Sequence, residues 1–140
     1  MPRPSAPLFT LAILLLVGCG GVADRLPTAA VSGTVTLDGD PLKKGNVTFV
    51  PQDGSGRPAT GMIQSDGSFV LGTYDDDDGA VLGQHRVAVV CQEPRGLPPN
   101  DGGTRSLIPL PYTNPGTSGL VFEVTAEGDN VFKIDLTSTE

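Results

Sequence analysis

The chain is poor in the residues that most often carry catalysis, metal binding and sugar recognition. It has no tryptophan, one histidine and two cysteines among 140 residues, and aromatic side chains make up only 5% of it. A zinc site needs three or four His, Cys or carboxylate ligands, so one histidine and one spare thiol fall short of it. The absence of tryptophan leaves few side chains on which a sugar ring could stack.

Positive charge is also scarce. Lys and Arg number 9 against 16 Asp and Glu, and the formal net charge is −7. Proteins that bind nucleic acid cluster Lys and Arg against the phosphates, and anionic lipid surfaces attract basic segments. The charge therefore argues against nucleic acid as a partner and against electrostatic adsorption to a membrane. Any membrane attachment has to be covalent or hydrophobic.

The only long apolar run is N-terminal. Ten mostly apolar residues, 8–17, follow Arg3 and end in Leu16-Val17-Gly18-Cys19. At ~1.5 Å per residue the run covers ~15 Å, about half of a bilayer core, which indicates a signal peptide and not a permanent span.

The tetrapeptide that ends at Cys19 resembles the lipobox of bacterial lipoproteins. The resemblance implies cleavage before Cys19, a diacylglyceryl group on its sulfur and an acylated amine, and two or more acyl chains anchor a protein stably. We therefore expect a signal peptide over 1–18 and a lipidated Cys19 with a flexible tether over 19–30. One domain follows, over 31–140. The residue after the cysteine is Gly20. An Asp at this position would resemble an inner-membrane retention signal, and its absence favours export to the outer membrane.

Short alternating segments separated by Gly and Pro fill the rest of the chain, and no helix is predicted. A period of two indicates half-buried strands, and seven of them with turns between predict an all-β, immunoglobulin-like sandwich. Two tight hairpins are expected, one at Ser65-Asp66-Gly67 and one closing the last two strands at Glu127–Asn130. Residues 92–119 are predicted to be irregular. The expected strands are 31–37, 45–50, 59–64, 68–71, 84–91, 120–124 and 130–136.

Several of these segments resemble the carboxypeptidase-regulatory-like domain, a transthyretin-like sandwich, as found in small lipoproteins of planctomycete bacteria. The resemblance rests on 33–42 with 45–51, on Thr60-Gly61 with 65–69, on 78–80 with 83–87, and on 108–120. It covers nearly the whole mature chain and implies the fold and the localisation of the protein. The family has no established activity, so the resemblance implies no chemistry.

His85 and Cys91 end up on the same face of the strand predicted over 84–91. That register predicts a packed histidine at the edge of the core and a small, buried, unreactive thiol. The family more often has an aromatic at the position of His85, which agrees with a packing role. The sequence contains no Gly-x-Ser-x-Gly elbow, phosphate loop or dinucleotide fingerprint, so we predict neither an enzyme nor a bound cofactor.

Asp75-Asp76-Asp77-Asp78 is the one distinctive polar cluster. Four carboxylates in a loop could hold Ca²⁺, which takes six to eight oxygen ligands. The EF-hand template does not fit, because Tyr74 and His85 would occupy positions that need carboxylates. A solvated acidic loop that aids solubility is the favoured interpretation.

Two functions remain open after these exclusions. The favoured one is a lipid-anchored interaction or assembly module that contacts a protein partner of the cell envelope through a loop or a strand edge. The alternative is a carbohydrate-binding module, for which Tyr74 and Tyr112 are the candidate sugar contacts.

Overall fold

The computed structural model describes residues 2, 25–95 and 103–138. Apart from Pro2, the signal peptide lies outside the described residues, as do Cys19 and residues 20–24 of the expected tether. The described chain is all-β, as predicted, and its one helical element is the 3-10 turn η1 (Leu110–Thr113). None of the helical residues described forms a segment with the length and apolarity that crossing a membrane requires.

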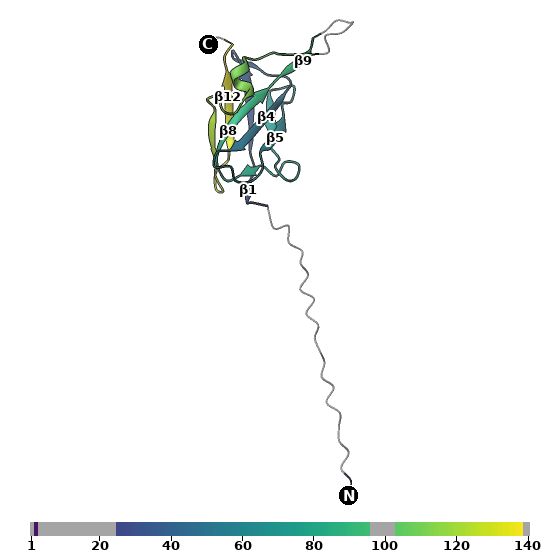
Figure 1. Cartoon of the computed structure of the whole chain (residues 1–140), viewed down its shortest axis with the longest axis vertical. Helices are drawn as coiled ribbons and strands as arrows, with labels where there is room; N and C mark the ends of the chain where they lie inside the picture. The colour runs from purple at the N-terminus through teal and green to yellow at the C-terminus, as the bar shows by residue number, and fades with distance from the viewer. Residues whose placement is uncertain (1, 3–24, 96–102, 139–140) are drawn as a thin grey trace.

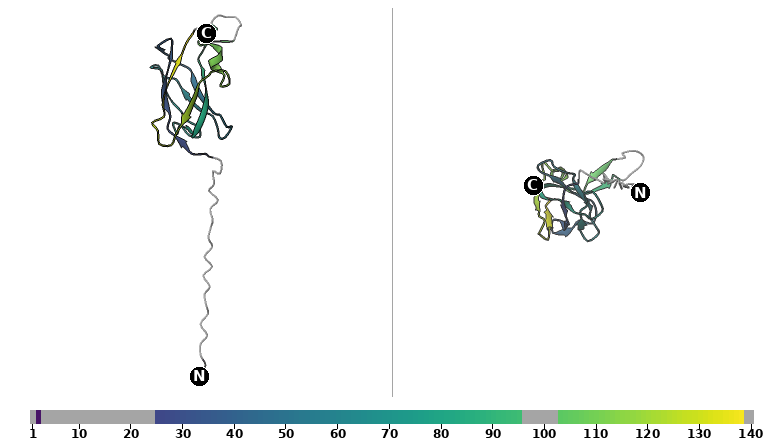
Figure 2. Two further views of the ribbon diagram at one scale, coloured as in Figure 1. Left: turned by 90° about the vertical axis from the view of Figure 1, so that its left-hand side faces the viewer. Right: turned by 90° about the horizontal axis from the view of Figure 1, so that it is seen from below.

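Two sheets pack face to face (Figures 1 and 2). The first sheet has the order β11-β8-β4-β5, all antiparallel, from β11 (Val121–Val124), β8 (Gly83–Val90), β4 (Asn46–Pro51) and β5 (Ala59–Met62). In the second, β2 pairs in parallel with β12 along one edge and with β3 and β6 in succession along the other. Its strands are β12 (Val131–Leu136), β2 (Ser32–Leu37), β3 (Asp40–Pro41) and β6 (Ser68–Val70).

Two small ribbons extend the sandwich at opposite ends (Figure 1). One joins the segment that enters the domain to the connection before β8, and the other continues from the end of β8. The first consists of β1 (Thr28–Ala29) and β7 (Ala80–Val81), and the second of β9 (Gln92–Pro94) and β10 (Thr104–Ser106). Since β8 runs from one ribbon to the other, its length sets the separation of the two ends.

The core follows the alternation expected from the sequence. On β8, His85, Val87 and Val89 are fully buried, and on β12 Ile134 and Leu136 are buried while the residues between them are exposed. The ring of Phe49 lies at the centre, with ring centroids 5.8–6.4 Å away in both sheets. Its neighbours are Phe69, His85, Phe122 and Phe132. This aromatic cluster joins the two layers across the core.

Both expected hairpins differ from the structure in their strand pairing. The turn at Gln64–Gly67 forms, with Gly67 N–H donating to Gln64 O at 2.9 Å, but β5 pairs with β4 while β6 pairs with β2. The last two strands separate in the same way, β11 joining β8 and β12 joining β2. Each connection crosses from one sheet to the other, because each of the flanking strands buries one face in the core between the sheets.

Two further predictions need correction. The expected flexible tether reached Ala30, yet Thr28 and Ala29 form a strand paired with Val81 and Ala80, so the domain begins before residue 31. Residues 92–119 were predicted to be irregular, yet they contain β9, β10 and η1. Each of these elements is two to four residues long, too short to give a periodic signal in the sequence.

Candidate functional site

The segment that enters the domain is held against the acidic loop by one tyrosine. Tyr74 Oη accepts the N–H of Leu26 at 3.0 Å, and the guanidinium of Arg25 lies 5.4 Å from the Tyr74 ring centroid. Arg25 also pairs with Asp75 at 2.7 Å, and Arg57 lies 6.0 Å from the same ring. A cation over an aromatic face contributes about 0.5–1 kcal/mol at an exposed site. These contacts fix where the chain enters the sandwich.

The acidic loop is itself shaped by Asp78. Its two carboxylate oxygens accept the backbone N–H groups of Thr73, Tyr74 and Asp75 at 2.6–3.1 Å. Desolvation raises the pKa of Asp78, but the three N–H donors and the charge of Arg25 outweigh that effect and leave the pKa lowered. Asp78 is therefore a loop-closing residue held in its ionised form.

The calcium interpretation of Asp75–Asp78 gains no support from this geometry. Asp78 accepts hydrogen bonds from its own loop and Asp75 pairs with Arg25. Across residues 25–95 and 103–138, no group of three or more His, Cys, Asp or Glu side chains is arranged to hold a metal ion. The carboxylates of Asp76 and Asp77 remain exposed at the surface.

The two tyrosines considered for sugar binding lie at different ends of the molecule. Tyr74 contacts the segment just before β1, whereas Tyr112 lies on η1 and its hydroxyl accepts the N–H of Thr137 at 3.3 Å. Figure 1 shows β1 and η1 at opposite ends of the sandwich. Tyr112 also packs against the core. The structure therefore does not bring the two rings together into one sugar-binding platform.

His85 is a core residue, as predicted. Its side chain is 0% exposed, its Nε2 lies 2.6 Å from Val81 O, and its ring centroid is 5.8 Å from that of Phe49. A carbonyl oxygen only accepts, so Nε2 is the donor in this contact. Nδ1 has no partner among the described residues. The imidazole ties β8 to the β7 strand and packs like an aromatic.

Cys91 is a buried free thiol. Burial raises the pKa of the thiol, and among the neighbouring charges Lys44 lowers it while Glu93 raises it. A raised pKa keeps sulfur in the unreactive thiol form at neutral pH, which matches the prediction of a small buried hydrophobe.

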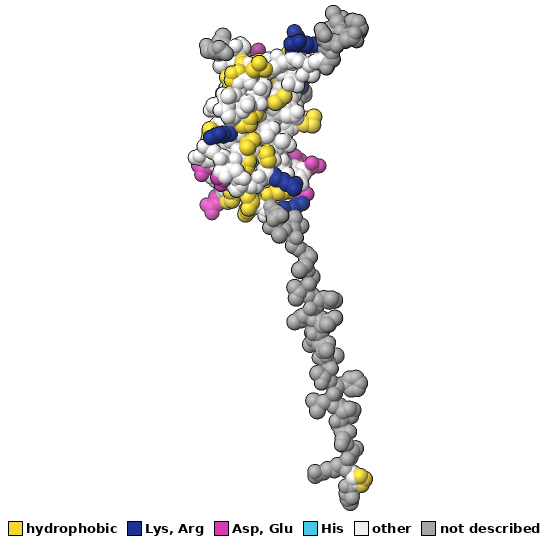
Figure 3. All heavy atoms as spheres, in the orientation of Figure 1, with side chains coloured by type: hydrophobic (Ala, Val, Ile, Leu, Met, Phe, Trp, Pro, Cys, Tyr) yellow, Lys and Arg dark blue, Asp and Glu magenta, His cyan; other side chains and the backbone are white. Residues whose placement is uncertain are grey.

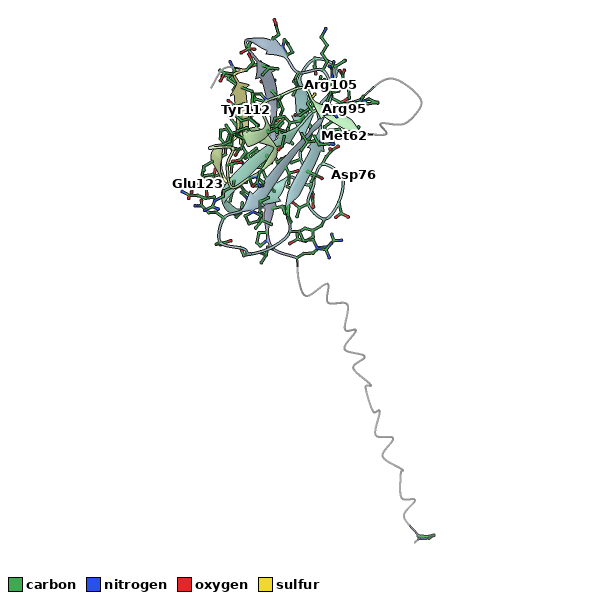
Figure 4. The ribbon with its side chains drawn as sticks, turned by 45° about the horizontal axis from the view of Figure 1, so that its top comes forward. Met62, Asp76, Arg95, Arg105, Tyr112 and Glu123 are labelled. Carbon is green, nitrogen blue, oxygen red and sulfur yellow. The ribbon has the colours of Figure 1, made fainter. Side chains whose placement is uncertain are left out.

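The β9–β10 ribbon carries much of the positive charge at the end opposite β1. Glu93 on β9 pairs with Arg105 on β10, and Lys44 lies 4.0 Å from the same carboxylate. Figure 4 shows Arg95 and Arg105 close together there, and Figure 3 shows basic side chains at this end and both acidic and basic ones toward the other. The ribbon stands off from the body of the sandwich (Figure 1).

A surface groove, which sequence reasoning missed, follows the seam between β5 and β6. It has a volume of about 700 Å³ and runs from Asn46 and Gln64 to the acidic loop at Asp75–Asp77. Met62 (70% exposed) and Val70 (47% exposed) line it. The sequence signal was present in Met62, an apolar residue on the outer face of an alternating strand. The seam itself depends on pairing between distant strands, which the sequence does not show.

Comparison with known proteins adds no identity. No protein-family model, no curated protein and no solved structure matches the chain. The resemblance to carboxypeptidase-regulatory-like lipoproteins therefore stays a prediction.

Proposed function

We propose that this protein is a lipid-anchored, non-catalytic interaction module of the bacterial cell envelope, exported and held at the outer membrane through Cys19. The polarity of the domain supports the proposal. The chain enters at the β1 end, and the β9–β10 ribbon projects from the opposite end (Figure 2).

The distance from the lipid to the domain is short. Arg25, which is paired with Asp75, lies six positions after Cys19, so an extended chain between them spans at most about 20 Å. An anchor at Cys19 would keep the β1 end near the bilayer. The β9–β10 ribbon would then face away from the membrane, where a partner in the envelope can reach it.

Membrane fractionation of the full-length protein and of Cys19→Ser tests the anchor. The wild type should sediment with membranes and carry the mass of a diacylglyceryl group at the N-terminal cysteine, while Cys19→Ser should be soluble after export. A wild-type protein with a free, unmodified thiol at Cys19 would contradict the proposal.

Capture from detergent-solubilised membranes tests the interaction. We expect one envelope protein to co-purify in near-equal amount with the tagged wild type. A variant in which Arg95 and Arg105 are both replaced by Ser should lose that protein, whereas the matched variant Lys133→Ser should retain it, since Lys133 lies on β12. Recovery of the wild type alone, under mild detergent and low salt, would contradict an interaction role.

A further inference from the structure

The groove between β5 and β6 owes its form to the way these strands change sheets. The two segments touch at both ends, where Thr60 bridges Gly72 and Gln64 N–H donates to Ser68 O at 2.8 Å. Between these points no bridge joins β5 to β6, because β6 pairs along β2. The surface at the seam is therefore a linear trough between two strands.

Gly61 permits the close approach that holds the seam together. A Cβ built at Gly61 would lie 2.4 Å from Val70 O, so any larger residue would push the strands apart. The exposed side chains of Met62 and Val70 line the trough next to the close approach of Gly61 and Val70. Two strands held at fixed spacing present a preformed surface, and a preformed surface loses little entropy when a ligand binds.

Negative charge without a counterion closes one end of the trough. Asp75 is neutralised by Arg25, whereas Asp76 and Asp77 make no ion pair or hydrogen bond with the described residues. Figure 4 shows Met62 and Asp76 on the same flank of the sandwich. The hydrogen bonds to Asp78 hold the backbone of this loop, and Asp76 and Asp77 line the groove at its end.

We propose that this groove binds an extended segment of a protein partner in which apolar residues are followed by lysine or arginine. Its side chains would pack on Met62 and Val70 while its cation meets Asp76 and Asp77. The proposal rests on the interaction role proposed above and names the chemistry of the partner. A linear trough favours an extended chain, and the acidic end disfavours anionic lipid, which would be repelled.

The test measures fluorescence anisotropy with the full-length protein in a neutral detergent. The probe is a labelled short peptide in which a run of valines is followed by lysine. We expect it to bind, and we expect Asp76→Asn/Asp77→Asn to weaken binding about tenfold or more, which equals ~1.4 kcal/mol. The matched control is Glu127→Gln/Asp129→Asn, which removes the same charge from exposed positions outside the groove and should bind as the wild type does.

Two comparisons separate a built groove from general attraction of a cation to an acidic protein. A peptide with serine in place of valine should bind more weakly, and Met62→Ser should weaken the valine peptide only. Equal binding of both peptides, or equal loss in both acidic double variants, would overturn the proposal. So would failure of the valine–lysine peptide to bind.

The results distinguish failure of the groove proposal from failure of the interaction role on which it rests. Peptide binding that depends on Asp76 and Asp77, with no partner captured from membranes, would support the groove and contradict the interaction role proposed above. If a partner is captured equally by the wild type, Met62→Ser and Asp76→Asn/Asp77→Asn, and the peptide does not bind, the interaction role is supported and the groove proposal is contradicted.

Discussion

His85 shows how a single polar residue is accommodated in this core. Its Nε2–H donates to Val81 O, and its Nδ1 has no hydrogen-bond partner among the described residues. The rest of the ring packs against Phe49 in the centre of the aromatic cluster. The packing of the ring therefore contributes more to the stability of the fold than its one hydrogen bond does, which agrees with the predicted packing role.

Two substitutions of His85 separate the contribution of ring packing from that of the hydrogen bond. His85→Ala should lower the free energy of unfolding by about 2–4 kcal/mol, because it leaves a cavity beside Phe49 and an unpaired carbonyl at Val81. His85→Phe keeps the packing and loses only the hydrogen bond, so we expect a loss of ~1 kcal/mol. Urea unfolding measures both values. Equal losses for the two variants would show that the hydrogen bond, and not the packing, dominates.

Asp78 predicts a pH dependence with a definite sign. Its pKa is lowered in the folded chain, because the N–H donors around it outweigh desolvation. A lowered pKa stabilises the fold fully above the unfolded value of about 3.9, and that stability is lost as the pH falls through the folded value. Asp78→Asn should therefore unfold more easily than the wild type at about pH 6, and the difference should shrink as the pH falls through the lowered pKa of Asp78.

Asp76→Asn is the control for this measurement, because Asp76 makes no hydrogen bond with the described residues. Its free energy of unfolding at about pH 6 should be close to that of the wild type, because the substitution removes no hydrogen bond. A difference for Asp78→Asn that does not change with pH would indicate that the loop depends on the shape of the side chain and not on its charge.

At the scale of elements, β1 and β7 depend on one glycine. Gly79 has φ +89, and a Cβ there would lie 1.7 Å from Ala29 O. The carbonyl of Ala29 therefore crosses directly over Gly79, which places β1 against β7. Together with the contacts of Tyr74, this crossing decides that the entering segment belongs to the domain.

Gly79→Ala should separate this ribbon from the sandwich. Gly39→Ala is the matched control, because Gly39 has φ +87 but nothing within 4 Å of its Cβ position. Backbone strain alone should reduce stability by about 1–2 kcal/mol in the control. Gly79→Ala should lose more, and hydrogen exchange at Thr28–Val31 should rise in that variant only. Equal exchange in both would show that β1 is not held by this crossing.

The strands could be predicted from the sequence to the extent that their signal is local. Alternation located all seven predicted strands, since each predicted segment overlaps an observed one, and it placed His85, Ile134 and Leu136 in the core. Pairing was not predictable, because Asp-Gly at 66–67 gives the same turn whether its arms join one sheet or two. The strand pairing was equally unpredictable at the connection between β11 and β12, which contains the buried Asn130.

Asn130 closes that second crossing with its side chain. Its Oδ1 accepts the N–H of Thr125 at 2.9 Å and its Nδ2 donates to Thr125 O at 2.8 Å, so the amide imitates a strand partner. In the sequence the same residue indicated a short hairpin turn. The strands on either side of this connection, β11 and β12, join different sheets because β11 pairs with β8 and β12 pairs with β2, both far away in the chain.

At the scale of the whole molecule, the sandwich has two unlike ends. The entering chain, Tyr74 and the acidic loop occupy one end, and the β9–β10 ribbon with Arg95 and Arg105 occupies the other (Figures 1 and 4). The groove along β5 and β6 runs between them. Of this candidate site the sequence indicated the acidic loop and Tyr74. It did not indicate the groove, because the groove is made by strands that meet through tertiary pairing.

Photo-crosslinking in living cells tests the interaction module most directly. A photoreactive residue is placed in turn at Met62 in the groove, at Thr104 on the ribbon, and at Val131, which is exposed on β12 away from both. We predict a discrete crosslinked product with one envelope protein from Met62 or Thr104, none from Val131, and loss of the product when Cys19 is replaced by Ser. The absence of any product from all three positions, or equal products from all three, would contradict the account.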